Sequence, residues 1–361
     1  MRVRAAVLRR PGHELEIVDA DLRDPGAGEV RVRVDACGIC RSDLHVADTG
    51  ESIQFPAVLG HEGAGVIEQA GPGSSLSVGD HVVLSWSPRC GTCPRCLEGA
   101  PNLCHQLTTS TDTGGLTLDG QALNSYMGLG CLVESVVLRQ QRVVPMPADL
   151  PAAALCLIGC GVATGYGAAV RTASISVGER VAVFGCGAVG LSAIQGARLA
   201  GAAQVIAVDP DPVRRDLATK LGATATLDPE APADVTAELL DRTAGGVDVA
   251  IEATGHPDVM ARLLDAVHPG GRAVVVGLPA ADATIEISPF HLLYEKTLTG
   301  SIYGSVDPHT EFPLMGELYR QGRLDLDSLQ GAHHGLDQAN DAFTELREHR
   351  SPRPIVRPNQ H

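Results

Sequence analysis

The stretch V-A-V-F-G-C-G-A-V-G, residues 181–190, decides the fold of this chain. Its first four residues are an apolar run typical of a buried strand, and a glycine-rich turn follows directly. From Ala188 to Ala200 the apolar residues recur with helical periodicity. The stretch therefore predicts a strand, a tight turn and a helix, which is the opening unit of a doubly wound α/β sheet.

Three glycines in this turn, Gly185, Gly187 and Gly190, have the spacing G-x-G-x-x-G. The first permits the tight turn, the second lets a pyrophosphate approach the backbone, and the third lets helix and strand pack closely. The N-terminus of the helix then offers unpaired N–H groups and a positive dipole end to the phosphates. Because the strand and helix context is present, we interpret this turn as a dinucleotide-binding site.

Asp209 ends the next apolar run, 19 residues beyond Gly190. A carboxylate there can accept hydrogen bonds from both ribose hydroxyls of adenosine and would repel a 2′-phosphate, so NAD is favoured over NADP. Alternatively, Asp209 could cap a helix from Pro210 to Leu221. Arg214 and Arg215 could pair with the ribose or phosphate region, or they could be solvated surface groups.

Further apolar runs alternate with helical segments and predict a parallel sheet of six strands. The first third of the chain instead carries short β-like runs at 30–34, 63–69 and 81–84, broken by Gly, Pro and Asp. We therefore predict a β-rich domain over 1–161, to which 303–361 returns with helical pieces at 314–320 and 336–347, and a Rossmann domain over 162–302. The expected strands after 181–184 are 205–208, 225–227, 247–251, 273–276 and 298–302.

Length and composition agree with two globular domains in 361 residues. The formal net charge of −15 makes nucleic acid and anionic membrane surfaces improbable partners. The basic start, Met1 to Gly12, has too short an apolar stretch for a secretory signal, so we expect a cytoplasmic protein. Leu150 to Val170 is uncharged for 21 residues but rich in Ala and Gly, which favours a buried segment over a membrane span.

Four cysteines, Cys90, Cys93, Cys96 and Cys104, have the spacing C-x2-C-x2-C-x7-C in a loop rich in Gly and Pro. Four thiolates so close in sequence can surround Zn²⁺ and leave no open position for chemistry, which predicts a structural zinc site. An iron–sulfur cluster uses the same number of cysteines, but this spacing matches neither common ferredoxin pattern.

A second set of metal-ligating residues is scattered: Cys40, His61, Glu62 and Cys160. Two thiolates and one imidazole would give Zn²⁺ three protein ligands and leave a fourth position for water or substrate. Each residue also has a structural explanation, and Cys37 with Cys40 has the redox spacing C-x-x-C. The residues alone do not decide whether Cys37 or Cys40, or Cys156 or Cys160, faces the metal.

Together these motifs resemble the zinc-containing medium-chain alcohol dehydrogenases, in particular the animal liver-type and glutathione-dependent formaldehyde dehydrogenase branches. The resemblance covers nearly the whole chain. It is carried by the segments G-I-C-R-S-D-L-H (38–45), G-H-E-G-A-G (60–65), C-G-T-C-P-R-C (90–96), L-I-G-C-G-V-A-T-G-Y-G (157–167) and the turn at 185–190. It implies a GroES-like β domain and a Rossmann domain.

The resemblance also implies the roles of individual residues. Cys40, His61 and Cys160 would ligate catalytic zinc with Glu62 beside them, and Asp43 would orient the ring of His61. Hydride would pass between the substrate and C4 of the nicotinamide, while the proton leaves through Ser42, the nicotinamide ribose and His45. Ser42 and Trp86 would border the substrate. The residues expected to contact NAD are Arg41, Thr164, Gly185, Gly187, Val189, Gly190, Asp209, Arg214, Gly277 and Arg353.

Two departures from the formaldehyde dehydrogenase branch bear on the substrate. That branch has an arginine shortly after the last structural cysteine that holds the carboxylate of its thiol adduct, whereas His105 to Thr111 contains none. Glutathione dependence is therefore not expected, and a dehydrogenase that uses a different thiol is the first alternative. Trp86 is bulkier than the phenylalanine or tyrosine usual at its place, which favours slender substrates.

The expected function is NAD-dependent interconversion of an alcohol with its aldehyde or ketone, with two zinc ions per chain. The alternative from another class is a non-catalytic member of the fold that has lost its zinc chemistry. The loop from His105 to Val133 is as long as in dimeric members of the family, so we expect a homodimer joined near Leu298 to Tyr303.

Overall fold

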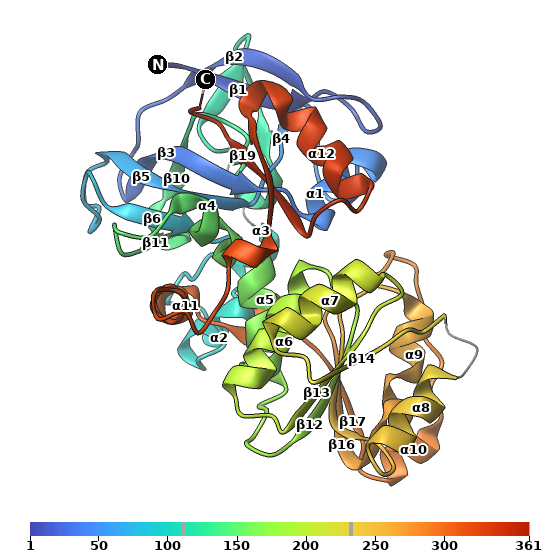
Figure 1. Ribbon diagram of the computed structural model, residues 1–361. Coiled ribbons are helices and arrows are strands. Elements are labelled where there is room, and N and C mark those ends of the chain that lie inside the picture. The colour runs from blue at the N-terminus through green and yellow to red at the C-terminus, as the bar shows by residue number, and fades with distance from the viewer. Residues whose placement is uncertain (110–112, 231–233, 361) are drawn as a thin grey trace. The chain divides into compact units, whose positions relative to one another are not determined.

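The computed structural model describes residues 1–109, 113–230 and 234–360. The chain forms two compact units, one made of Met1–Cys160 with Asp307–His361 and the other of Gly161–Val306. Figure 1 shows the β-rich first unit and the α/β second unit. The sequence placed the boundaries of the central domain at 162 and 302.

The described residues of unit 1 form two β-sheets. One has the strand order β8-β7-β2-β1-β4-β9, and the other has the order β11-β6-β5-β3-β19-β18 with β10 also paired to β3. The C-terminal strand β19 pairs antiparallel with β3, Val356 opposite Cys37, so the end of the chain completes the sheet that its first third begins. Its strands are β1 Arg2–Leu8, β2 Glu16–Leu22, β3 Glu29–Gly38, β4 Ala57–Val58, β5 Glu62–Ala70, β6 His81–Leu84, β7 Leu116–Leu118, β8 Gln121–Ala122, β9 Asn124–Ser125, β10 Ser135–Arg139, β11 Val143–Pro145, β18 Gln330–Gly335 and β19 Arg353–Arg357.

The helices of unit 1 are few and short, as expected for a domain built on sheets. They are α1 Arg41–Thr49, α2 Pro94–Leu97, α3 Gln106–Thr109, α4 Ala152–Leu155, α11 Pro308–Arg320 and α12 Ala339–Arg347. α11 begins earlier than the expected piece at 314–320, because Asp307 caps it by accepting the backbone N–H of His309 and Pro308 occupies its first position.

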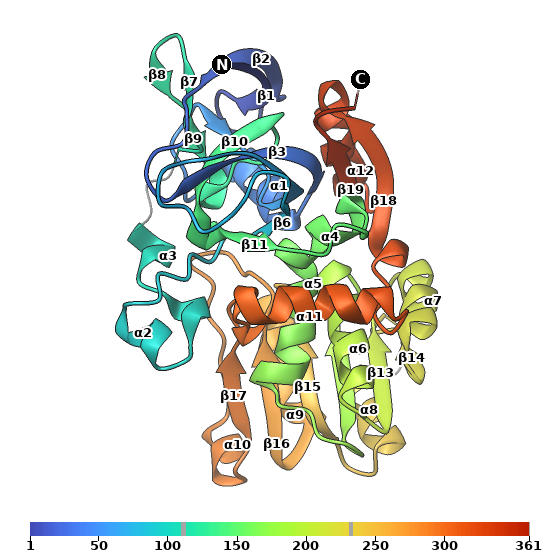
Figure 2. The ribbon, with the colours of Figure 1, turned by 90° about the vertical axis from the view of Figure 1, so that its left-hand side faces the viewer.

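Unit 2 is a doubly wound sheet of six parallel strands in the order β14-β13-β12-β15-β16-β17 (Figure 2), and Figure 1 shows α6 on one side of this sheet and α8 and α9 on the other. This order reverses direction at β12, which is the arrangement of dinucleotide-binding folds and confirms the predicted fold class. The strands are β12 Arg180–Phe184, β13 Gln204–Val208, β14 Ala225–Leu227, β15 Val247–Glu252, β16 Val267–Val275 and β17 Thr297–Gly300, and the helices are α5 Gly161–Gly167, α6 Ala188–Leu199, α7 Pro212–Leu221, α8 Val235–Arg242, α9 Pro257–Ala266 and α10 Pro289–Leu293.

The main error in the expected strands is at β16, which begins at Val267 rather than Ala273. Val267 pairs with Val247 and Arg272 pairs with Val249, and a register shift between these two pairs accommodates the residues H-P-G-G that lie between them. The uncharged stretch at 150–170 is mostly buried. Within the described residues no single helix is long and apolar enough to cross a membrane, although the bent pair Ala152–Gly159 and Gly161–Thr172 reaches that length and composition together.

Candidate active site and metal centres

Four residues from distant parts of the sequence meet in unit 1. One ligand atom from each of Cys40, His61, Glu62 and Cys160 lies within 4.8 Å of the others, and all four residues are buried. Cys40 follows β3 and forms the N-cap of α1, while His61 and Glu62 stand where β5 begins. Cys160 ends the 3₁₀ turn Cys156–Gly159. Three segments of the same unit therefore deliver the group.

The alternatives Cys37 and Cys156 lie outside this group. Cys37 is part of β3 and directs its sulfur toward Gly60, where a Cβ atom would lie only 2.8 Å away. The thiol of Cys156 donates to the backbone oxygen of Ala153 at 3.3 Å. Burial raises the pKa of both thiols well above the ordinary value, as expected for inert core cysteines.

Asp43 joins the segments that carry these ligands. One of its oxygens accepts the backbone N–H of Cys40 at 3.0 Å, which closes the first turn of α1, and the other accepts that of Gly60 at 2.8 Å. Oδ2 also lies 3.1 Å from Nδ1 of His61. A single buried carboxylate therefore orients both Cys40 and His61.

The other ring nitrogen of His61, Nε2, is the one available as a metal ligand. Nε2 is buried and has no hydrogen-bond partner among the described residues, so a metal ion would supply the partner that this polar atom lacks. The ring of Tyr126 packs edge-on against the His61 ring with 5.4 Å between centroids. Burial works against the charged imidazole, but Asp43 and Cys40 raise its pKa overall.

Arg353 lies within the same group instead of at the surface. Its Nε is 3.2 Å from Oε2 of Glu62, and both side chains are buried. A hydrogen bond from Cys160, followed by the charges of Arg353 and His61, lowers the pKa of Cys40 well below its usual value. This environment stabilises the thiolate form that metal ligation requires. The structure pairs Arg353 with Glu62, and the pyrophosphate contact that the resemblance implies for Arg353 stays a prediction.

The residues expected to carry protons lie on α1. The Cys40 thiol contacts Ser42 Oγ at 3.7 Å. His45 stands three residues further along the helix, with Nε2 3.1 Å from a carboxylate oxygen of Glu51 and its side chain partly exposed. Residues three apart share a helix face, so Ser42 and His45 lead from the buried group toward solvent. Arg41 is exposed and contacts the ring of His349.

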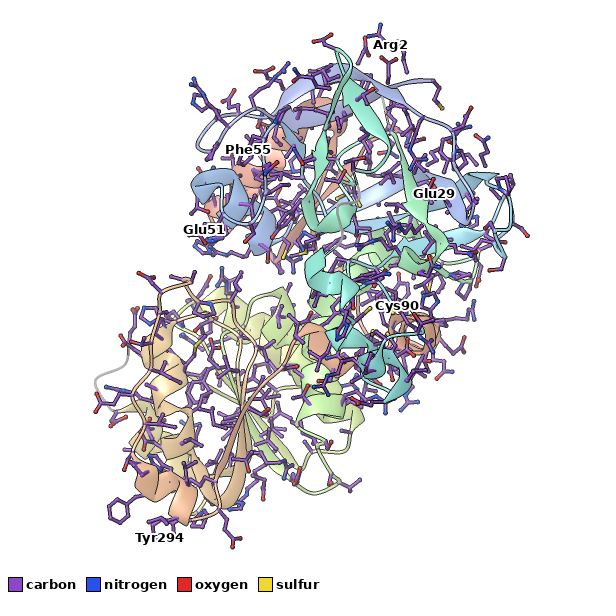
Figure 3. All side chains as sticks on the ribbon, turned by 180° about the vertical axis from the view of Figure 1, so that it is seen from behind. Arg2, Glu29, Glu51, Phe55, Cys90 and Tyr294 are labelled. Carbon is purple, nitrogen blue, oxygen red and sulfur yellow. The ribbon has the colours of Figure 1, made fainter. Side chains whose placement is uncertain are left out.

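The four clustered cysteines form a second metal-ligand group, whose first member, Cys90, is labelled in Figure 3. Cys90 and Cys96 sulfurs are 3.8 Å apart, and those of Cys93 and Cys104 are 4.0 Å apart. Tetrahedral Zn²⁺ with bonds of about 2.3 Å requires sulfur separations of about 3.8 Å, whereas a disulfide needs about 2 Å. Backbone N–H groups of Thr92 and Cys93 lower the pKa of Cys90 to about 6. The group fits a structural zinc ion.

In unit 2 the three glycines of the turn have the environments that their spacing predicts. Gly185 has φ +92°. A Cβ on Gly190 would lie 1.8 Å from the backbone oxygen of Gly185, so only glycine allows α6 to approach β12 this closely. A Cβ on Gly187 would meet nothing within 4 Å. Space is therefore open at the helix N-terminus, where a pyrophosphate would approach the backbone.

Asp209 does not cap a helix. Asp211 caps α7 by accepting the N–H of Val213, while Asp209 accepts the backbone N–H of Cys186 at 2.7 Å and so connects the end of β13 to the glycine turn. Arg214 Nη1 lies 4.0 Å from Asp209, and Arg215 donates to the Asp209 backbone oxygen at 2.6 Å. Asp209 is therefore held beside the turn by contacts from both sides.

The remaining expected cofactor residues also lie in unit 2. Thr164 is in α5 and Val189 is in α6. A Cβ on Gly165, the residue after Thr164, would lie 2.0 Å from the backbone oxygen of Val189, so the two helices are in close contact there. Gly277 donates its N–H to Oε2 of Glu252 at 3.2 Å. Glu252 was missed by sequence reasoning, because unlike Asp209 it does not stand at the motif's distance from the glycine turn. It is fully buried and also accepts from Thr254 and Gly255.

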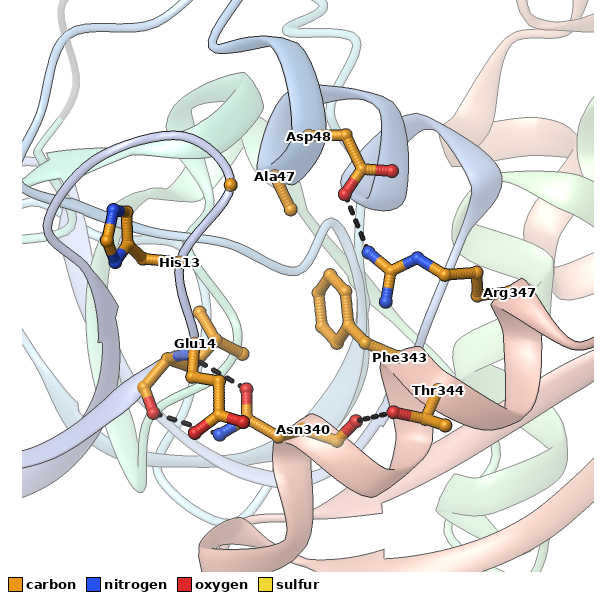
Figure 4. A pocket seen from close by; sticks show the side chains of 10 residues that line it. His13, Glu14, Ala47, Asp48, Asn340, Phe343, Thr344 and Arg347 are labelled. Atoms are coloured by element: carbon orange, nitrogen blue, oxygen red, sulfur yellow. Dashed lines mark hydrogen bonds and ion pairs between the residues drawn. The ribbon is translucent and has the colours of Figure 1, made fainter.

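A separate hollow of about 180 Å³ opens on unit 1 between the 12–15 loop, α1 and α12 (Figure 4). Several of its polar groups pair with one another: Arg347 pairs with Asp48 at 2.6 Å, and the amide of Asn340 exchanges hydrogen bonds with the backbone of Leu15. None of the predicted site residues lines it. This hollow contributes nothing to the candidate site.

Comparisons with known proteins match both parts of the chain. The model of the alcohol dehydrogenase GroES-like domain matches residues 26–148, and that of zinc-binding dehydrogenases matches residues 188–320. Class-3 alcohol dehydrogenase of Cereibacter sphaeroides is 36% identical over 374 residues, covering 99% of this chain and 100% of that protein. S-(hydroxymethyl)glutathione dehydrogenase of Escherichia coli is 37% identical over 369 residues, with coverage of 99% and 100%. The crystal structure of benzyl alcohol dehydrogenase from Acinetobacter calcoaceticus has a TM-score of 0.93 at 34% identity and covers 99% of each chain.

Proposed function

The chain belongs to the zinc-containing medium-chain alcohol dehydrogenase family, and from this premise we propose that it interconverts a primary or secondary alcohol and its aldehyde or ketone with NAD. The observation that carries the proposal is the convergence of Cys40, His61 and Cys160, with Nε2 of His61 lacking a partner among the described residues. Zinc held there by three protein ligands would keep an open position and act as a Lewis acid on the substrate oxygen.

The residues of the chain orient the site and move the proton. Asp43 fixes the His61 ring so that Nδ1 faces the carboxylate and Nε2 faces the cysteines. The hydroxyl of Ser42 would accept the proton of the substrate hydroxyl while releasing its own proton along the relay to His45, which is held by Glu51 and would pass that proton to solvent. In unit 2, the open space beside Gly187 and the Asp209 carboxylate bind the pyrophosphate and the adenosine ribose of NAD.

A second candidate is oxidation of the adduct of formaldehyde with a thiol other than glutathione. It is supported by the relatives named S-(hydroxymethyl)glutathione dehydrogenase. The missing arginine in His105 to Thr111 argues against glutathione itself; residues 110–112 of that loop lie outside the described part of the chain.

The deciding experiment is a panel of primary, secondary and aromatic alcohols, tested with NAD and NADP and with and without low-molecular-weight thiols. Zinc is measured on the same sample. We expect two zinc ions per chain and thiol-independent turnover with NAD, which Cys40→Ser abolishes. Turnover only with an added thiol and formaldehyde would favour the second candidate. One zinc per chain and no turnover would favour a non-catalytic member of the fold.

We also propose that the chain forms a homodimer through β17. This strand is the last of its sheet, so its outer edge has no partner strand among the described residues. Large apolar side chains are exposed on the neighbouring α10 and beside β17, which is unusual for a free surface. They are Phe290, Leu292, Leu293, Tyr294 and Ile302, of which Tyr294 is labelled in Figure 3.

A further inference from the structure

Arg142 is an arginine in the interior of unit 1. It ends the 3₁₀ turn Gln140–Arg142 between β10 and β11, and only 2% of its surface is exposed. A guanidinium is costly to bury unless its N–H groups meet acceptors, and arginine is almost never fully buried without them. The hydrogen-bond acceptors of Arg142 therefore indicate which segments this side chain holds together.

The first acceptor is the backbone of Trp86. Nη1 of Arg142 donates to the Trp86 carbonyl oxygen at 2.9 Å. The backbone of Arg142 also accepts the N–H of Ser85 at 2.8 Å, and the Ser85 hydroxyl donates to the carbonyl of Ser87 at 3.0 Å. The short segment that follows β6 is thus attached to Arg142 at Ser85 and at Trp86.

The second acceptor lies in the turn Tyr126–Gly128. The same Nη1 donates to the carbonyl of Met127 at 3.2 Å. A Cβ on Gly128 would lie 2.8 Å from Nη2 of Arg142, and Gly128 has φ +69°, so glycine provides both the turn and the room for the guanidinium. Tyr126, the first residue of this turn, is the side chain that packs edge-on against His61.

The same loop is connected to the metal-ligand group through its backbone. Cys131 donates its N–H to the carbonyl of Gly60 at 2.9 Å, and Leu132 donates to Leu59 at 3.0 Å, directly before His61. Arg142 therefore connects the Trp86 segment to a loop whose position relative to His61 is already set.

We propose that Arg142 is a positioning residue that holds Trp86 relative to Tyr126 and thereby decides which alcohols the site accepts. The inference deepens the proposed function and rests on it, together with the place beside the substrate that the family resemblance implies for Trp86. A guanidinium presents its N–H donors in a rigid plane, so two carbonyls are held in one geometry. A lysine at this position would keep the positive charge, but its flexible side chain would not hold the two carbonyls in one fixed geometry.

Fluorescence tests the positioning directly. Trp86 is the single tryptophan of the chain, so intrinsic emission reports on it alone. In Arg142→Lys we expect a red-shifted emission maximum and about twofold stronger acrylamide quenching, because loss of the fixed geometry lets the indole move.

Arg139→Lys, at an exposed site three residues away, is the matched control, and its emission should equal that of the unsubstituted protein. Gly128→Ala keeps the arginine but crowds it and should change the emission in the same direction. Unchanged emission in both Arg142→Lys and Gly128→Ala overturns the proposal.

Kinetics test the specificity. In Arg142→Lys we expect the kcat/KM ratio of butan-1-ol to benzyl alcohol to change about tenfold, mainly through KM, since reshaping an apolar pocket alters discrimination by this order. Zinc content should stay at the level of the unsubstituted protein. An equal loss of activity on both alcohols would indicate a purely structural role and overturns the proposal. If the unsubstituted protein oxidises no alcohol, the proposed function fails, and the fluorescence result still decides whether Arg142 positions Trp86.

Discussion

Oδ2 of Asp43 lies 3.1 Å from Nδ1 of His61, with both side chains completely buried. This contact determines which imidazole nitrogen faces Cys40 and Cys160, because the nitrogen engaged by the carboxylate cannot also ligate a metal. Asp43 reaches His61 from the first turn of α1, and its second oxygen holds Gly60. The ligand geometry therefore depends on a residue that would not itself touch the metal.

Asp43→Asn tests this dependence. The amide replaces one accepting oxygen with a donor, which would face a backbone N–H or the His61 ring. We expect affinity for the zinc at Cys40, His61 and Cys160 to fall about 10- to 100-fold. Competition with a chelator measures the affinity. Asp48→Asn, an exposed carboxylate on the same helix, is the control, and equal zinc retention in both variants would contradict the role of Asp43.

The two zinc groups should be separable by substitution. Cys104→Ser is expected to lose one zinc ion per chain and to lower the unfolding temperature, since a closed four-sulfur site contributes folding free energy. Cys40→Ser is expected to lose the other ion and all turnover. Metal analysis with thermal unfolding checks both variants. If Cys104→Ser retained two ions, the assignment of the four-cysteine group would be wrong.

Substitution by alanine at two glycines of the dinucleotide turn should have different effects, on stability at one and on NAD affinity at the other. In Gly190→Ala the new Cβ meets the Gly185 backbone oxygen at 1.8 Å, and we expect destabilisation of about 1–3 kcal/mol from overpacking. In Gly187→Ala the new Cβ meets no protein atom within 4 Å, so the variant should unfold at the same temperature as the unsubstituted chain. It should nevertheless bind NAD weakly, because the methyl group occupies the space needed by the pyrophosphate. Thermal unfolding and NAD titration separate the two effects. Normal NAD affinity in Gly187→Ala would show that the cofactor does not approach there.

Asp209→Asn should weaken the preference for NAD. The neutral amide loses charge-assisted hydrogen bonds to the ribose, each worth about 1.5–3 kcal/mol, and no longer repels a 2′-phosphate. We expect KM for NAD to rise about tenfold or more, in line with that loss, and the NADP to NAD ratio of kcat/KM to increase. Asp211→Asn, at the helix cap, should leave the ratio unchanged. A higher kcat/KM of the unsubstituted enzyme with NADP than with NAD would contradict the role proposed for Asp209.

Dimer formation should depend on the apolar side chains next to β17. Leu293 is 75% exposed, and Leu293→Glu places a charge where the proposed interface buries apolar surface. We expect this variant to elute as a monomer in size-exclusion chromatography with light scattering, whereas the unsubstituted chain elutes as a dimer. Val78→Glu, an exposed apolar site in unit 1, should remain a dimer. A monomeric unsubstituted chain would exclude the interface.

Several features could be predicted because they are local. The turn at 185–190 needs glycine for reasons that involve only the adjacent strand and helix, and the run of apolar and helical segments after it specifies a parallel sheet. The four cysteines between Cys90 and Cys104 are close enough in sequence that spacing alone brings them together. The strand limits were least accurate at β16, where a register shift against β15 lets the strand continue through a proline and two glycines, residues with low strand preference.

By itself, then, the sequence determined the two-domain α/β architecture, the glycine turn and the four-cysteine group, because neighbouring residues constrain one another through short stretches of backbone. Only the tertiary structure decided that Cys40 and Cys160 meet His61 while Cys37 and Cys156 do not, that Arg353 pairs with Glu62, and that Arg142 connects Trp86 to Met127. These relationships join residues that are distant along the chain. They depend on the direction in which each side chain leaves its strand or turn, and that direction is set by packing against the rest of the domain.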